Sequence, residues 1–415
     1  MVDVTLIQVP NLFLASPLMY PFSLSLMYLA ASLERAGAKV ALADLRDKEL
    51  SSIDLDTIPP ARYFGFTATT GEISAARTLA ALLKDKYPDS QTVVGGAHAS
   101  VLPEDCQPHF DIVAVGEWDY AIVNLFQKGH TNGIVYANQV SDLDSLPLPA
   151  RHLAGTRAFT NILMPGEKYG TGNRAAMLIS SRGCPQTPAC AFCANITRGV
   201  RFRSPENVLL EVEELVERYN VREWRDEADN LTTSKKWLLE YCRLLAPLKV
   251  SWKGHTRADY LDEDEVIAMK EAGLVEFGIG VESADPEVLR IIRKKETVED
   301  YNRAIRLLKK YGVISKVYLM SGLPGETEQT LALNASFFEE AKPDKWTLLR
   351  FVPLPGCDIW QHPENYRARI DRDQFANFVF WPTEGPIEYE GVSKQVLDAR
   401  FNRMYSYLRS DKWRQ

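Results

Sequence analysis

Three cysteines, Cys184, Cys190 and Cys193, lie within ten consecutive residues, directly after an apolar run and the turn Ser181-Arg-Gly183. Closely spaced thiolates are metal ligands, and a structural zinc ion needs four protein ligands in a closed tetrahedron. The sequence has no histidine or further cysteine nearby as a fourth ligand. A cubane iron-sulfur cluster held by three thiolates leaves one iron open to a ligand. The spacing favours such a cluster over zinc with a distant fourth ligand or three buried free thiols.

This cysteine trio resembles the signature of the radical S-adenosylmethionine superfamily, which is usually Cys-x-x-x-Cys-x-x-Cys on the loop after the first strand of a barrel. The second interval matches, as does the aromatic Phe192 before the last cysteine, whereas the first interval holds five residues, two of them prolines. The resemblance implies that Cys184, Cys190 and Cys193 bind a [4Fe-4S] cluster and that S-adenosylmethionine binds its open iron, next to Phe192.

Length and composition restrict the class of protein. A chain of 415 residues exceeds one ordinary core, so two domains and an extension are expected. The formal net charge of −7 argues against a nucleic-acid partner, because phosphate contacts need clustered lysine and arginine. Six cysteines without a disulfide-dense pattern fit a reducing compartment, so a cytoplasmic location is expected.

One uncharged stretch, residues 12–33, is long enough to cross a bilayer. Pro17 and Pro21 interrupt it, and no basic residues precede it as they would in a signal peptide. A loop followed by a buried helix from about Ser23 to Gly37 explains the same residues. No membrane association is therefore expected.

Residues 3–136 alternate short β-rich runs with helical patterns, which is typical of a doubly wound, Rossmann-like parallel sheet. One amphipathic helix is expected at 72–86. The expected strands are 4–9, 40–43, 63–66, 92–94 and 112–115.

Ligands of such sheets bind at the carboxyl ends of the strands. The residues expected there are Thr67, Thr69, Gly95, Gly96, Gly116 and Glu117. A glycine pair after a strand allows close approach of a ligand to the backbone, or simply makes a tight turn. This half resembles the cobalamin-binding domain found ahead of the radical domain in one large class of the superfamily, so the resemblance implies that these residues bind cobalamin. The Asp-x-His-x-x-Gly motif of other cobalamin domains does not occur in the sequence.

The remaining chain repeats strand and helix, the pattern of a parallel barrel. The expected strands are 176–180, 222–225, 250–253, 276–281, 316–320 and 345–351. Six units predict a partial (β/α)6 TIM-type barrel. The tail contains Trp381, Tyr389, Tyr405, Tyr407 and Trp413 among charged residues and is expected to pack on the open side of the barrel or to cap its site. The expected domains are 1–140 cobalamin-binding-like, 141–170 linker, 171–360 radical barrel and 361–415 extension.

Polar residues follow successive barrel strands, where parallel barrels gather their reactive groups. Glu227 follows the second strand and is a candidate catalytic residue. Arg257, after the third, offers a planar fork to the carboxylate of S-adenosylmethionine, or else pairs with Asp259 or Asp226.

The fourth strand ends in Glu282 and Ser283, and a buried unpaired carboxylate there would be costly. The resemblance implies that Glu282 accepts hydrogen bonds from the ribose hydroxyls and that Gly322, in a Gly-x-Pro-Gly turn, lies beside the adenine. Cys357, at the end of the sixth strand, is a candidate hydrogen donor, additional metal ligand or radical quencher, or an ordinary buried thiol.

The resemblance implies cluster-driven cleavage of S-adenosylmethionine and functionalisation of an unactivated carbon, with cobalamin-dependent methyl transfer to a small molecule as the leading hypothesis. An electron donor such as flavodoxin or ferredoxin is an expected partner. The alternatives are a radical oxidoreductase, cyclase or rearranging enzyme without methyl transfer and, more remotely, a zinc-stabilised binding module.

Overall fold

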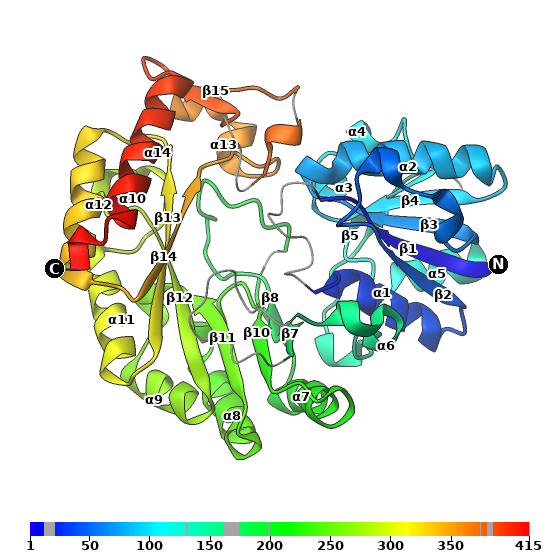
Figure 1. Ribbon diagram of the computed structural model, residues 1–415, viewed down its shortest axis with the longest axis horizontal. Coiled ribbons are helices and arrows are strands. Elements are labelled where there is room, and N and C mark those ends of the chain that lie inside the picture. The colour runs from blue at the N-terminus through cyan, green and yellow to red at the C-terminus, as the bar shows by residue number, and fades with distance from the viewer. Residues whose placement is uncertain are drawn as a thin grey trace. The chain divides into compact units, whose positions relative to one another are not determined.

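The computed structural model describes residues 1–11, 21–129, 132–160, 174–197, 199–373, 375–379 and 385–414. The predictions for residues 12–20, the linker residues 161–170 and Trp381 lie outside these ranges. The chain divides into two compact units (Figure 1). Unit 1 comprises Met1–Met177 and Tyr219–Val221, and unit 2 comprises Leu178–Arg218 and Arg222–Gln415.

Unit 1 contains a six-stranded parallel sheet in the order β2-β1-β3-β4-β5-β6. Its strands are β1 (Val2–Gln8), β2 (Val40–Asp44), β3 (Ala61–Thr67), β4 (Gln91–Gly95), β5 (Ile112–Gly116) and β6 (Gly133–Ala137). Figure 1 shows helices on both faces of the sheet, which confirms the doubly wound fold. These helices are α1 (Leu24–Arg35), α2 (Ile73–Lys86), α3 (Ala97–Val101), α4 (Pro103–Cys106), α5 (Ala121–Lys128) and α6 (Arg151–Ala154).

Helix α1 covers the second half of the uncharged stretch of residues 12–33. The Ser23 side chain accepts a hydrogen bond from the Leu26 backbone N–H and so begins the helix. Leu26, Ala30 and Leu33 are fully buried at helical spacing, so the apolar residues belong to the core of unit 1. Within the parts of the chain that the structure describes, every helix is too short or too polar to span a lipid bilayer.

A second six-stranded parallel sheet, in the order β14-β13-β12-β11-β10-β7, forms the core of unit 2, and only its edge strand β7 begins in residues assigned to unit 1. Its strands are β7 (Ala175–Leu178), β10 (Glu223–Asp226), β11 (Ser251–Thr256), β12 (Leu274–Glu282), β13 (Ile314–Ser321) and β14 (Lys345–Arg350). The helices along its outer side in Figure 1 include α7 (Pro205–Tyr219), α8 (Lys235–Leu245), α9 (Glu263–Glu271), α11 (Val298–Lys310) and α12 (Glu328–Ala341). This arrangement confirms the predicted partial barrel.

The two faces of the barrel strands carry different residues. On β11, Trp252 packs against Tyr241 of α8, with ring centroids 5.9 Å apart. The face of β11 that carries Trp252 is therefore turned toward the helices. Lys253 and His255 alternate with it and lie on the inner face, paired in register with Glu276 and Gly278 of β12. Lys253 and His255 therefore line the interior of the barrel.

The C-terminal residues belong to unit 2 and pack beside its edge strand β14. Helix α14 (Lys394–Arg409) places Tyr405 edge-on to Trp346 of β14, and Arg400 donates to the Glu326 carbonyl at 2.6 Å. The antiparallel pair β15 (Ala368–Ile370) and β16 (Ile387–Tyr389) brings the Tyr389 hydroxyl to the Gly322 carbonyl, at 2.7 Å. The extension thus reaches the carboxyl end of β13.

Candidate cofactor site

The cysteine loop follows β7 and is fixed by backbone hydrogen bonds on two sides. The Ala191 N–H donates to the Ile292 carbonyl at 2.8 Å, and the Ala191 carbonyl accepts from the Ile359 N–H at 3.1 Å. Ile292 directly follows α10 (Pro286–Ile291), and Ile359 lies in α13 (Asp358–Gln361). Cys190 and Cys193 are therefore held between two elements distant in sequence, with half-buried Phe192 between them.

Gly183, immediately before Cys184, has a conformation that only glycine readily adopts. Its φ is 95°, and a Cβ at this position would overlap the Gly199 carbonyl oxygen. Its N–H donates to Asp229 Oδ2 at 2.6 Å. The backbone therefore enters the ligand loop in a single tight turn, anchored by a residue that follows β10.

The sulfur positions do not match a preassembled zinc site. In the described residues, the group of three His, Cys, Asp or Glu ligands whose atoms lie within 4.8 Å of one another is His98, Asp105 and Cys106. Tetrahedral zinc with Zn–S bonds of about 2.3 Å would bring its sulfurs to about 3.8 Å from one another. The sulfurs of Cys184, Cys190 and Cys193 are not all within 4.8 Å of one another, whereas a cubane holds its thiolates farther apart, each on a different iron.

Two thiols at this site are buried, and burial raises the pKa of each. Burial raises the pKa of Cys190 to about 11, against the opposing effect of the Lys294 and Arg257 charges. Burial likewise raises the pKa of Cys357 to about 11, and the neighbouring Cys193 contributes to the increase. Cys357 is fully buried at the start of α13, and its sulfur accepts a hydrogen bond from the Trp360 N–H at 3.4 Å. The structure thus brings Cys357 close to the cysteine loop, as the sequence suggested.

Arg257 has an internal partner. Its Nε and Nη2 atoms donate to the two carboxylate oxygens of Asp259 at 3.0 and 2.9 Å, and Nη2 also donates to the Lys294 carbonyl at 3.0 Å. Its Nη1 lies 3.5 Å from the Glu296 carboxylate. The ion pair with Asp259, one of the two arrangements expected from the sequence, is the one present, and binding of a cofactor carboxylate by Arg257 stays a prediction.

Glu282 ends β12 in a strained conformation. Its φ is 64°, unusual for a residue with a side chain, and the register with β13 shifts between Gly280 and Glu282. The side chain folds back over Gly280, because a Cβ on Gly280 would lie 2.6 Å from Glu282 Oε1. Glu282 is almost buried, and its Oε1 lies 3.3 Å from Lys294 Nζ.

Lys294 and Glu296 complete this charged group and were not predicted from the sequence. Lys294 Nζ lies between Glu282 Oε1 and Glu296 Oε2, 3.2 Å from the latter. Burial lowers the pKa of Lys294, but the two carboxylates outweigh it, so the pKa lies above its usual value. Burial raises the pKa of Glu296 against the charges of Lys294 and Arg257. The four charges of Arg257, Lys294, Glu282 and Glu296 are called the buried ion cluster below.

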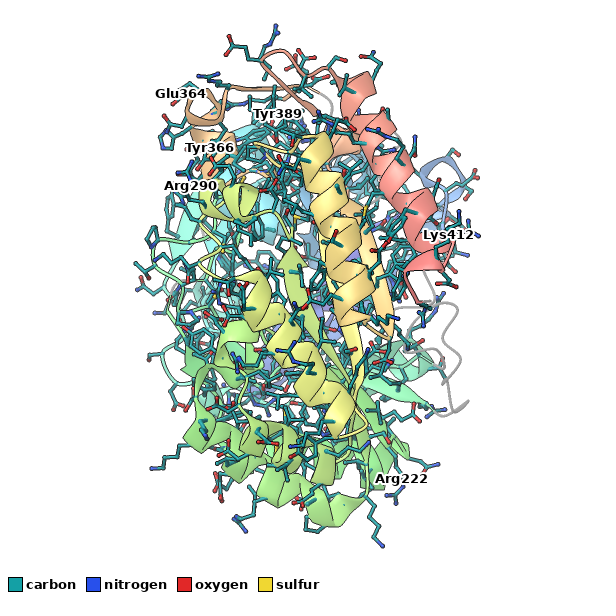
Figure 2. All side chains as sticks on the ribbon, turned by 90° about the vertical axis from the view of Figure 1, so that its left-hand side faces the viewer. Arg222, Arg290, Glu364, Tyr366, Tyr389 and Lys412 are labelled. Atoms are coloured by element: carbon teal, nitrogen blue, oxygen red, sulfur yellow. The ribbon has the colours of Figure 1, made fainter. Side chains whose placement is uncertain are left out.

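Ser283 and Gly322, the predicted residues at the carboxyl ends of β12 and β13, make local hydrogen bonds. The Ser283 hydroxyl accepts from the Asp285 N–H at 3.1 Å. The Gly322 N–H donates to Glu326 Oε2 at 2.8 Å, and burial raises the pKa of Glu326 to about 7. Figure 2 shows Tyr389, whose hydroxyl bonds to Gly322, at the opposite end of unit 2 from Arg222, which precedes β10.

Glu227 follows β10 and is half-buried, with its Oε1 3.0 Å from Arg225 Nε. Burial raises its pKa, and Arg225 opposes the increase. On the inner face of β11, burial and the Arg225 charge lower the pKa of His255 to about 4, so its imidazole is neutral near pH 7. The barrel interior thus contains groups that could hold or accept a proton.

In unit 1 the predicted residues lie at the carboxyl ends of three neighbouring strands. Gly95 pairs with Thr67 in register. A Cβ on Gly96 would lie 2.7 Å from Thr67 Oγ1, and one on Gly116 would overlap the Ala137 carbonyl oxygen. Both glycines have φ above 90°, so tight backbone packing explains them without a ligand.

The two other predicted residues at this edge have structural partners as well. Thr69 forms a capping box with Glu72, in which the Thr69 N–H and hydroxyl both donate to Glu72 Oε2, at 2.9 and 2.8 Å. Glu117 Oε2 accepts from the Val140 N–H at 2.8 Å. His98 is fully buried, with its ring nitrogens 3.2 Å from Thr70 Oγ1 and 2.8 Å from Asp105 Oδ2, so both nitrogens have partners within the protein.

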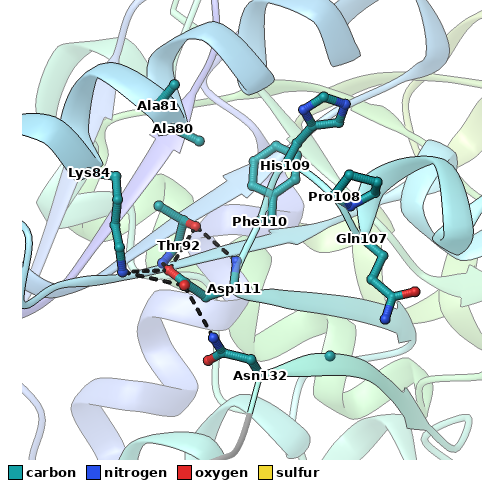
Figure 3. A pocket seen from close by; sticks show the side chains of 11 residues that line it. Ala80, Ala81, Lys84, Thr92, Gln107, Pro108, His109, Phe110, Asp111 and Asn132 are labelled. Carbon is teal, nitrogen blue, oxygen red and sulfur yellow. Dashed lines mark hydrogen bonds and ion pairs between the residues drawn. The ribbon is translucent and has the colours of Figure 1, made fainter.

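A cavity of about 390 Å³ lies at the opposite edge of this sheet, at the amino ends of β4, β5 and β6 (Figure 3). Asp111 is its central charged group. Its carboxylate accepts from Lys84 Nζ at 3.0 Å, from the Thr92 N–H at 2.8 Å and from Asn132 Nδ2 at 3.4 Å. These bonds satisfy the carboxylate within the protein.

Comparison with known proteins identifies both units. Residues 178–337 match the Radical SAM superfamily, and residues 11–126 match the B12 binding domain. The chain therefore carries a radical SAM domain and, ahead of it, a B12 binding domain.

The chain is 29% identical over 381 residues to the anaerobic magnesium-protoporphyrin IX monomethyl ester cyclase of Rubrivivax gelatinosus, covering 85% of this chain and 68% of that protein. It is 27% identical over 370 residues to an uncharacterized methyltransferase of Pyrococcus horikoshii, covering 82% and 78%. Its fold is similar to that of the radical S-adenosylmethionine methyltransferase TsrM from Kitasatospora setae, solved with cobalamin and a [4Fe-4S] cluster, with a TM-score of 0.66 and 15% identity over 92% of this chain and 83% of that one.

Proposed function

We propose that this chain is a radical S-adenosylmethionine enzyme that uses a three-cysteine [4Fe-4S] cluster and cobalamin to transfer a methyl group to an unactivated carbon of a small molecule. The main support is a three-cysteine loop at the carboxyl edge of a parallel barrel, in a chain that also matches the B12 binding domain. Similarity to the Pyrococcus horikoshii methyltransferase favours methyl transfer.

In this proposal Cys184, Cys190 and Cys193 would hold the cluster. Their donor set fits, because three thiolates without a fourth cysteine in the loop leave one iron open. When bound, the cluster supplies the electron that cleaves S-adenosylmethionine, and cobalamin supplies the methyl group. Glu282 would accept hydrogen bonds from the ribose hydroxyls, and Arg257 would bind the carboxylate of the methionyl end.

The carboxyl edge of unit 1 fits a large ligand that approaches the backbone. Glycines and threonines there keep side-chain bulk low, at Thr67, Thr69, Gly95, Gly96 and Gly116. Glu117 is already hydrogen bonded and would contribute its remaining acceptor capacity. Because both nitrogens of His98 are engaged, His98 does not serve as a cobalt ligand in this proposal.

Glu227 and Cys357 are the candidate reactive groups. The raised pKa of Glu227 keeps its carboxyl protonated to a higher pH than an exposed glutamate, so it can give or take a proton in the barrel interior. The buried thiol of Cys357 remains protonated near neutral pH and could donate a hydrogen atom beside the cysteine loop.

A second candidate is radical oxidation or cyclisation without methyl transfer. It is favoured by the 29% identity to the magnesium-protoporphyrin IX monomethyl ester cyclase, which extends over 85% of this chain. Both candidates share cluster, cobalamin domain and small-molecule substrate, and both need an electron donor such as flavodoxin or ferredoxin. They differ in whether the methyl group of S-adenosylmethionine reaches the product.

The test uses anaerobically reconstituted protein, reduced by a flavodoxin system, with S-adenosylmethionine that carries a deuterated methyl group. The substrate panel includes magnesium-protoporphyrin IX monomethyl ester. We expect 5′-deoxyadenosine together with a product that carries the deuterium label. 5′-Deoxyadenosine with an unlabelled product would favour the second candidate, and a reconstituted protein without iron or sulfide would contradict both.

A further inference from the structure

The turn that follows α10 links the cysteine loop to the end of β12. Its first residue, Ile292, accepts the hydrogen bond from Ala191 between Cys190 and Cys193. Two positions on, Lys294 directs its ammonium to Glu282, at 3.3 Å. One short segment therefore contacts both the loop that would hold the cluster and the carboxylate that would face the ribose.

The backbone of this turn is strained on both sides of Lys294, and this conformation buries the Lys294 side chain. Arg293 and Lys295 have φ of 57° and 58°, although neither is a glycine. Left-handed residues with side chains cost of order 1 kcal/mol each and persist only where their surroundings impose them. They flank Lys294 and leave it almost fully buried, while Lys295 is exposed.

Gly280 provides the room for the ion pair. A Cβ at this position would lie 2.6 Å from Glu282 Oε1 and 3.2 Å from Lys294 Nζ. The carboxylate and the ammonium therefore occupy the space next to the β12 backbone that a side chain would fill. An almost buried carboxylate is costly without a partner of opposite charge, and Lys294 is that partner for Glu282.

Lys294 engages only one oxygen of Glu282. Its Nζ lies near Oε1, and the described residues give Oε2 no hydrogen-bond partner. Lys294 thus fixes the carboxylate through Oε1 and leaves Oε2 as a free acceptor. A ribose with two neighbouring hydroxyls presents donors of the kind that such an acceptor binds.

We propose that Lys294 is a positioning residue that holds Glu282 oriented to accept hydrogen bonds from the ribose hydroxyls of S-adenosylmethionine. This inference rests on the proposed function, because it requires that cofactor. Glu296, on the other side of Lys294, holds the ammonium in place.

The experiment measures the affinity of anaerobically reconstituted protein for S-adenosylmethionine and for its analogue that lacks both ribose hydroxyls. We expect the natural protein to bind the analogue about 10- to 100-fold more weakly, because hydrogen bonds to a charged acceptor are lost. In Glu282→Gln and in Lys294→Met the ratio of the dissociation constants for the analogue and for S-adenosylmethionine should fall to about threefold or less. Lys294→Arg should restore most of it, because the positive charge is kept.

Lys295→Met is the matched control. Lys295 is exposed and donates to the Thr187 carbonyl in the cysteine loop, so this variant tests damage to the loop without loss of the buried charge. It should keep the ratio of the natural protein. Iron and sulfide content should be the same in all variants, which shows that the cysteine loop still holds its cluster.

If Lys294→Met does not fold, the double variant Lys294→Met with Glu296→Gln decides, because it removes the second unpaired carboxylate together with the ammonium. A ratio in the folded Lys294 variant equal to that of the natural protein would overturn the role of Lys294. Failure of the natural reconstituted protein to bind S-adenosylmethionine would instead overturn the proposed function.

Discussion

The carboxyl edges of the two sheets are lined by different types of residue. In unit 1 the residues at this edge are mainly glycines and threonines, and Gly96 and Gly116 are required by neighbouring backbone and the Thr67 hydroxyl. In unit 2 the corresponding edge holds the buried ion cluster, and Gly280 is required by the ends of two charged side chains. A backbone-lined edge suits a bulky ligand held by shape, whereas paired buried charges suit a small charged cofactor held at defined points.

The largest expected effect is on the cysteine loop of unit 2. Replacing Cys184, Cys190 or Cys193 with Ala should abolish cluster retention, because two thiolates cannot hold the cubane against loss to solvent. Iron and acid-labile sulfide after reconstitution should fall from about four per chain to a small fraction of that. Cys242→Ala is the control, because Cys242 is buried in α8 away from the loop, and it should keep its iron.

The second largest effect is expected when a glycine at either edge is replaced with alanine. Gly116→Ala should destabilise unit 1 by about 3 kcal/mol, because its Cβ meets a backbone carbonyl at a left-handed φ. Gly280→Ala meets only side-chain ends, so unit 2 should stay folded while affinity for S-adenosylmethionine falls about tenfold. Urea unfolding and cofactor titration separate the two outcomes, and equal loss of stability in both variants would remove the distinction between the edges.

The buried acid Glu326 predicts a pH dependence in unit 2. Burial raises its pKa to about 7, above that of an unfolded glutamate, so the folded state binds the proton more tightly. Stability from this group is therefore greatest at low pH and is lost as pH rises from about 4.5 to 7, by on the order of 2 to 3 kcal/mol. Glu326→Gln should flatten the decline in unfolding free energy between pH 5 and 7.5, and an unchanged slope would contradict this assignment.

The smallest effect is expected at the unit 1 cavity. Asp111→Asn removes the charge that Lys84 and Thr92 bind, and should cost about 1 kcal/mol at pH 7, because the pair is partly exposed. Burial opposes ionisation of Asp111, but the bonds from Thr92 and Lys84 lower its pKa, so this contribution is lost only as pH falls below the ordinary aspartate range. Thermal unfolding of Asp111→Asn measures this loss of stability, and the iron content of the variant should not change.

Most strands could be predicted from the sequence because buried parallel strands are short apolar runs bounded by turns. The strand β6 was missed, since its residues are half-buried or exposed at the edge of the sheet and carry a weaker signal. The helix from Ser23 was found because its capping residue and apolar spacing agree.

The buried ion cluster was found only in part. Glu282 stood out because an acidic residue directly followed an apolar strand. Lys294 and Glu296 lie in the run Arg293-Lys-Lys-Glu296, which as a sequence has the composition of a solvated surface. The left-handed backbone at Arg293 and Lys295, which turns Lys294 inward, has no signature in residues other than glycine.

Elemental analysis of protein reconstituted anaerobically with iron, sulfide and hydroxocobalamin tests the central claim that unit 2 holds an open iron-sulfur cluster and unit 1 holds cobalamin. The account predicts about four iron atoms per chain, cobalt equimolar with the chain and no zinc. Zinc equimolar with the chain and no iron or labile sulfide would contradict it.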